Sequence, residues 1–226
     1  MFDVYYLIFV VPALILSIWA QYKVKSTFSK YSQETNARGI KGAQAAAYLL
    51  KVNNITDVKI EPVSGSLTDH YSPTEKILRL SEPVYAQPTI AAVGVAAHET
   101  GHAIQHATNY GPLVLRSALV PVANIGSAAG PILAVLGIAL SFGFLTNIGL
   151  LLFAASVLFY IVTLPVEFNA SNRALKILAK TGTLSEEELK GVKKVLSAAA
   201  MTYVASALTA IGNLLRMIFL SKNRRN

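Results

Sequence analysis

Two histidines and a glutamate lie close together in the segment His98-Glu99-Thr100-Gly101-His102 of this 226-residue chain. Of all residues in the sequence, these have the types and spacing that best fit metal binding and proton transfer. Residues four apart lie on one face of a helix, so both imidazoles can reach one Zn²⁺ ion at ~2.0–2.1 Å. Glu99 stands beside them and can take a proton from a zinc-bound water and pass it to a leaving amine. The pattern predicts one zinc ion per chain with Glu99 as the catalytic residue.

A helix with two unrelated histidines is the alternative explanation of this pattern. Residues 93–97, which precede it, are all apolar or glycine, and this predicts a buried helix. Buried histidine and glutamate need partners, and a metal ion supplies them. The chain has no cysteine, so the ligands must be histidine, aspartate or glutamate.

A third protein ligand is needed, and His106 and Glu167 are the candidates. His106 continues the four-residue spacing, but it lies ~12 Å along the helix axis from His98, too far for one unbroken helix to bring both to one ion. It is better explained as a supporting or structural residue. Glu167 directly follows a long apolar region that can fold as a membrane hairpin and return the chain to the side it left. The sequence therefore favours Glu167 as the third ligand.

Composition indicates several membrane segments. The chain is 53% hydrophobic and 14% charged, with a mean hydropathy of +0.47. Residues 1–20 and 117–166 supply three spans, and residues 198–220 supply a fourth that either crosses the bilayer or lies in its interface, because it contains Arg216. We expect a mainly α membrane protein with three or four transmembrane helices and a small α+β zincin-like cytoplasmic part.

The net charge of +8 raises nucleic acid as a partner, but no basic face interleaved with aromatic residues is present. The basic residues instead flank apolar runs, which is typical of cytoplasmic loops beside anionic lipid. Lys23, Lys25 and Lys30 follow the first apolar stretch, whereas residues 142–149 carry no charge. The N-terminus and the 142–149 turn should therefore lie outside, and the candidate site should lie on the cytoplasmic side.

Four regions are expected along the chain: an anchor helix at 1–20, a cytoplasmic part at 21–116, a transmembrane hairpin at 117–166, and a ligand helix with a membrane-associated C-terminal helix at 167–226. Periodicity and turn residues predict the elements within them. We expect helices at 36–52, 89–108 and 167–179, strands at 57–62 and 76–81, turns between the strands, a break at 181–183 and a helix N-cap at Ser185.

Several segments together resemble the bacterial YugP-like family of membrane neutral zinc metallopeptidases, of the gluzincin type. They are Lys30–Ser32, Leu67–Tyr71, the motif helix through His106, Val120–Asn124 and Pro165–Arg173. The layout is also similar to the HtpX/Ste24-type peptidases, where Glu-x-x-x-Asp gives the third ligand and a supporting aspartate. Here Ser171 stands four residues after Glu167, so Asn169, Ser171 or Asp69 is expected to support the histidines. The resemblance implies zinc-dependent peptide hydrolysis at the cytoplasmic membrane face.

Other polar residues are candidates with ordinary alternatives. Asp69-His70-Tyr71 precedes a predicted strand that can hold an extended substrate by edge pairing, and Tyr71 or His70 would then reach the oxyanion; a plain polar turn is the alternative. Arg173 can brace the third ligand, polarise a carbonyl or act as a cytoplasmic anchor. Tyr203 is either a transition-state hydrogen-bond donor or an interfacial aromatic residue.

The sequence thus favours a multi-pass zinc metalloendopeptidase of the bacterial cell membrane that acts on proteins or peptides. A site-2-type intramembrane protease would need the motif inside a spanning helix and a metal-binding aspartate in a later one. A non-catalytic zinc-binding chaperone or scaffold would not need Glu99. A metal transporter would need ionisable residues inside the spans, and residues 117–166 contain none. Neither the substrate nor the oligomeric state follows from the sequence.

Overall fold

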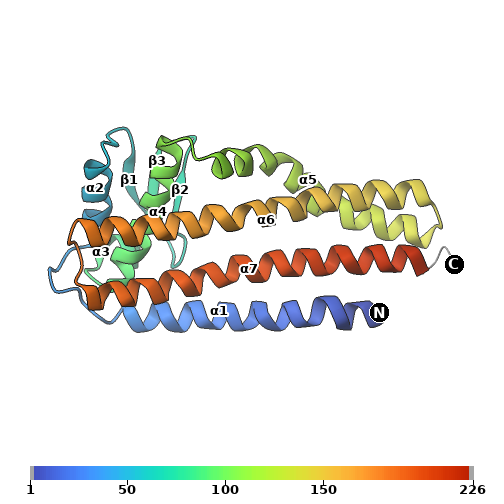
Figure 1. Cartoon of the computed structure of the whole chain (residues 1–226), viewed down its shortest axis with the longest axis horizontal. Coiled ribbons are helices and arrows are strands. Elements are labelled where there is room, and N and C mark those ends of the chain that lie inside the picture. The colour runs from blue at the N-terminus through green and yellow to red at the C-terminus, as the bar shows by residue number, and fades with distance from the viewer. Residues whose placement is uncertain (1–2, 224–226) are drawn as a thin grey trace. The chain divides into compact units, whose positions relative to one another are not determined.

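The computed structural model describes residues 3–223 and is mainly helical, with one small sheet. Figure 1 labels most of the elements. In chain order they are η1 (Tyr6–Val10, a π-helical turn), α1 (Val11–Tyr31), α2 (Gly42–Val52), β1 (Lys59–Val63), β2 (His70–Ser72), β3 (Ile77–Ser81), α3 (Glu82–Ala86), α4 (Ile90–Ala107), α5 (Gly111–Ala139), α6 (Gly143–Lys180) and α7 (Glu186–Asn223). The expected class, a helical membrane protein with a small α+β part, is confirmed.

The described chain forms two compact units. Residues 3–21, 114–165 and 201–223 make up one, here called the apolar unit, and residues 22–113 and 166–200 make up the other, the mixed unit. Because α1, α6 and α7 are continuous, each contributes residues to both units.

Helix α4 lies at the centre of the mixed unit. On one side it faces the sheet, in which β3 is the middle strand, parallel to β1 and antiparallel to β2. Leu78 and Leu80 of β3 are fully buried against Ala96 of α4. A second cluster joins α4 to the ends of α6 and α7 that belong to this unit, through residues such as Ala174 and Val192. Burial on both sides holds α4 in place, since each fully buried leucine or valine contributes about 1.5–3 kcal/mol.

Four helices are candidate membrane spans, and each contributes residues to the apolar unit. Within residues 3–223, the helices spanning 6–31, 111–139, 143–180 and 186–223 are long and apolar enough to cross a bilayer. Helices α5 and α6 form a hairpin whose backbones nearly touch: a Cβ atom at Gly126 would lie 2.2 Å from the Leu152 carbonyl oxygen. Such close approach through glycine is typical of helix pairs in membranes.

Helix α7 also pairs with the start of the chain. The Arg216 guanidinium donates to the Asp3 carboxylate at 2.7 and 2.9 Å, and it lies over the Tyr6 ring. Phe9 stacks on Phe219 in the same unit. The Asp3 carboxylate offsets the charge that made residues 198–220 ambiguous, and α7 qualifies as a fourth candidate span.

Most predicted elements appear with small changes in their ends. The predicted strands at 57–62 and 76–81 are β1 and β3, and the predicted helix at 89–108 is α4. The predicted cap is confirmed, because the Ser185 hydroxyl accepts from the Glu188 amide while Glu188 accepts from the Ser185 amide.

Other elements differ from the sequence prediction for identifiable reasons. The helix expected from residue 36 begins at Gly42, because the Asn36 side chain binds the Ile40 and Pro88 backbone and holds residues 36–41 out of the helix. The turn expected at 142–149 is confined to 140–142. Gly149 instead packs inside the hairpin, where a Cβ atom added to it would lie 2.2 Å from the Ala134 amide nitrogen. The segment around residues 70–72 is a short strand rather than a turn.

Candidate metal centre

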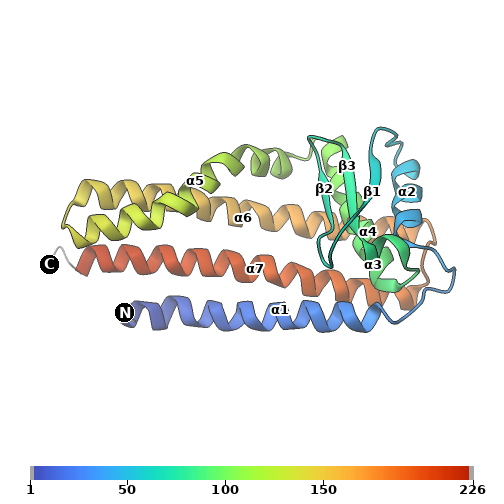
Figure 2. The same ribbon diagram turned by 180° about the vertical axis from the view of Figure 1, so that it is seen from behind.

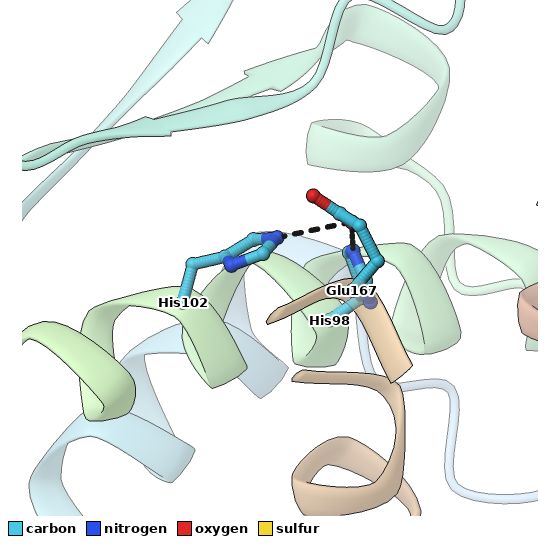
Figure 3. A group of neighbouring side chains, drawn as sticks. All are labelled: His98, His102 and Glu167. Atoms are coloured by element: carbon cyan, nitrogen blue, oxygen red, sulfur yellow. Dashed lines mark ion pairs between the residues drawn. The ribbon is translucent and has the colours of Figure 1, made fainter. Parts of the chain in front are cut away.

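Helix α4 presents both motif histidines on one side. It begins at Ile90, where the Thr89 hydroxyl accepts a hydrogen bond from the Ala92 amide, and runs unbroken to Ala107. Its spacing places His98 and His102 one turn apart, with their rings 4.8 Å apart and nearly perpendicular. Figure 3 shows the two side chains on the same side of the helix, facing the carboxylate of Glu167.

Glu167 comes from α6, whose backbone approaches α4 closely beside the motif. A Cβ atom at Gly101 would lie 2.6 Å from the Ala170 carbonyl oxygen, well inside the closest approach that real Cβ atoms show. The glycine inside the motif is therefore required for packing. It lets α6 come close enough for Glu167, whose side chain is 3% exposed, to reach the histidines.

The three side chains converge with distances that suit a metal ion. Glu167 Oε2 lies 3.3 Å from His98 Nε2 and 3.5 Å from His102 Nε2. Ligands at ~2.0–2.1 Å from a tetrahedral zinc ion are separated by ~3.3 Å. Among the described residues, these three form the group of histidine and acidic side chains able to hold a metal. The donor set and its spacing therefore fit zinc.

The outer nitrogen of each imidazole has a hydrogen-bond partner. His98 Nδ1 lies 3.1 Å from the Ser171 hydroxyl, and His102 Nδ1 donates to Gln105 Oε1 at 3.0 Å. These contacts orient both rings with Nε2 towards Glu167, as metal-ligating histidines require. The sequence named Ser171 as a supporting candidate but did not single out Gln105, although its position three residues after His102 on the same helix face was a usable signal.

Gln105 is fully buried and joins α4 to α6. Its Nε2 donates to the Val166 carbonyl at 2.8 Å and to Asn169 Oδ1 at 3.0 Å. Asn169 Oδ1 also accepts from Arg173 Nε at 2.7 Å, and the Arg173 guanidinium lies over the Tyr110 ring. Arg173 therefore contacts the site through Asn169.

The surroundings of the site are negatively charged. Burial opposes protonation of His102, but the Glu167 and Glu99 carboxylates outweigh it and raise the pKa of His102. Burial also raises the pKa of Asp69, and the nearby Glu99 charge adds to this, while hydrogen bonds from Ser81 oppose it. Glu99 is 8% exposed. A cluster of carboxylates that favours a proton on an imidazole also favours a cation bound between them.

Neither of the other two histidines belongs to the group formed by His98, His102 and Glu167. His106 pairs with the Tyr71 hydroxyl through Nδ1 at 2.8 Å and does not belong to the metal group. His70 is exposed, and its Nδ1 faces the Thr68 carbonyl. Tyr203 belongs to the apolar unit.

A membrane protein with the His-Glu-x-x-His motif on one helix and a glutamate on a later helix that faces both histidines has the plan of a membrane zinc peptidase. A family model described as "Putative neutral zinc metallopeptidase" matches residues 6–222. The chain is also 50% identical over 216 residues to the "Putative membrane protease YugP" of Bacillus subtilis (strain 168), covering 96% of each sequence. This chain belongs to that neutral zinc metallopeptidase family. No solved structure matches it.

Proposed function

We propose that this protein is a zinc-dependent endopeptidase of the bacterial cell membrane that cleaves protein or peptide substrates at the cytoplasmic face. The observation that carries the proposal is the convergence of His98, His102 and Glu167 within one metal-sized group, with Glu99 next to the first histidine. Membership of the zinc peptidase family supports the same chemistry.

His98 Nε2, His102 Nε2 and a Glu167 oxygen would hold the zinc ion. When bound, zinc supplies a Lewis acid that acidifies water and polarises a peptide carbonyl. Glu99 accepts a proton from the attacking water and delivers it to the leaving amine. Ser171 and Gln105 keep the imidazoles oriented throughout.

The cytoplasmic location rests on the charges of the loops. Lys23, Lys25 and Lys30 follow the apolar part of α1, and basic residues are frequent between 173 and 194, whereas the 140–142 turn has no charge. Positively charged loops stay on the cytoplasmic side. With α7 as a fourth span, Lys222, Arg224 and Arg225 would lie outside, against this rule, and the last two lie outside the described residues.

The test compares full-length, detergent-purified wild-type protein with Glu99→Gln and with Glu82→Gln, an exposed glutamate outside the site. Peptides blocked at both ends serve as substrates, so that only internal cleavage is detected. We expect one zinc per chain in all three proteins and a loss of about 10²–10⁴-fold in kcat in Glu99→Gln alone. If the wild type binds zinc but cleaves no peptide, the non-catalytic zinc-binding scaffold is the function that remains. If the wild type binds no zinc, the proposal is rejected entirely.

A further inference from the structure

A pocket of about 330 Å³ lies beside the last turn of α4, against Tyr71 of β2 and the residues that precede β1 and β3. Ile55, Val58, Ala103 and Ala107 form its apolar lining. Ile55 and Ala103 belong to a buried cluster that also includes Tyr71, so the base of the pocket is part of the packed interior. The proposed hydrolysis mechanism assigns no role to the residues that line this pocket.

Four of the five polar residues that line the pocket pair with one another, and the fifth is Asn109. Tyr71 and His106 are hydrogen-bonded at 2.8 Å, with their rings 5.8 Å apart, and together form an aromatic wall. Asp57 and Lys76 form an ion pair at the rim, and both remain about half exposed. A charged side chain entering the pocket would have to compete with this pair, whereas an uncharged one would not.

Helix α4 links the pocket to the metal group, because it carries both His102 and the pocket residue His106. His106 follows His102 by one helical turn, which is ~6 Å along α4. Strand β2 packs beside the same helix, and its Tyr71 is hydrogen-bonded to His106. An extended peptide advances ~3.3 Å per residue, so a chain following this strand reaches the pocket about two residues from the cleaved bond.

We propose that this pocket is a specificity site that binds one large uncharged side chain of the substrate, aromatic in preference to aliphatic. The inference rests on the proposed peptidase function. The apolar base and aromatic wall favour such a side chain, and the volume, at the lower end of the range for ligand pockets, suits one side chain rather than a longer segment.

Ala107→Leu tests this proposal by filling the pocket from an exposed position at the end of α4. Ala179→Leu, an exposed alanine on α6 that does not line the pocket, is the matched control. Zinc-loaded full-length proteins are given a blocked peptide library in which each position near the cleaved bond carries tyrosine, leucine, alanine or glutamate. For the wild type and the control we expect preference for tyrosine, then leucine, at one position. Ala107→Leu should lower kcat/KM for those peptides by about 10–200-fold and leave the alanine peptides within about twofold.

Binding to zinc-loaded Glu99→Gln provides a readout that does not need turnover. By calorimetry, the tyrosine peptide should bind at least about tenfold tighter than its alanine counterpart, and Ala107→Leu in the same background should remove the difference. Cleavage without side-chain preference, or equal binding of both peptides, would overturn the pocket assignment alone. Selective binding by a wild type that cleaves nothing would overturn the peptidase proposal and retain the pocket.

Discussion

Replacing Gln105 by leucine removes one buried group that supports a proposed metal ligand while leaving all three proposed ligands in place. Three hydrogen bonds disappear: one from His102 Nδ1, and two donated to the Val166 carbonyl and Asn169. Asn169 Oδ1 keeps its bond from Arg173. The His102 N–H, however, loses the Gln105 acceptor, and the His102 side chain is only 12% exposed.

Two separate losses follow from this. A buried donor without an acceptor costs about 1–3 kcal/mol of folding free energy. Loss of the partner that orients a ligating histidine lowers metal affinity about 10–100-fold, which corresponds to about 1.4–2.7 kcal/mol. Compared with the wild type, the Gln105→Leu protein should therefore unfold more easily in the absence of metal. It should also bind zinc about 10–100-fold more weakly.

Zinc affinity is measured by competition with a chromophoric chelator at fixed pH, and stability by thermal unfolding of the zinc-free protein. Thr100→Val is the control, because Thr100 is equally buried on α4 but its hydroxyl donates to the Ala96 carbonyl of its own helix. It should lose stability and keep its zinc affinity. If the zinc Kd of Gln105→Leu stays within about twofold of the wild type, Gln105 does not orient His102.

Three further predictions concern the ligand, the packing and the topology. Glu167→Gln keeps the shape of the side chain but removes its charge, so zinc measured by mass spectrometry should fall well below one per chain; full zinc content would assign the third ligand elsewhere. Gly101→Ala places a methyl group 2.6 Å from the Ala170 carbonyl oxygen, so α6 must shift, and zinc affinity should drop by at least about tenfold. Because the chain has no cysteine, Ser141→Cys should react with a membrane-impermeant maleimide in intact cells, whereas Lys180→Cys should react only after lysis; the reverse pattern would place the site outside.

The sequence predicted what depends on short spacing. The four-residue interval between His98 and His102 defines a helix face, and the apolar hairpin before Glu167 indicated its return towards them; the structure brings all three together. The roles of these residues remain predictions. Ser171 was found as a candidate because it occupies the position four residues after Glu167.

Contacts between distant segments were harder to predict. The partnership of Gln105 with Val166 and Asn169 depends on how closely α6 approaches α4, which a single sequence does not encode as a pattern. Strand β2 has three residues and depends on pairing with β3 rather than on local propensity. The continuity of α6 through Pro165 was also missed, because the change from apolar to polar sequence suggested two elements.

Helix α6 is one uninterrupted rod of 38 residues that carries both an apolar span and Glu167. A bilayer thicker or thinner than its apolar stretch changes the tilt of such a helix. Any rotation or tilt of α6 that the mixed unit does not follow would move Glu167 relative to the two histidines on α4. The acyl-chain length of the surrounding lipid would then affect zinc affinity. Zinc affinities measured in short-chain detergent and in lipid of native thickness should therefore be compared before either is taken as the physiological value.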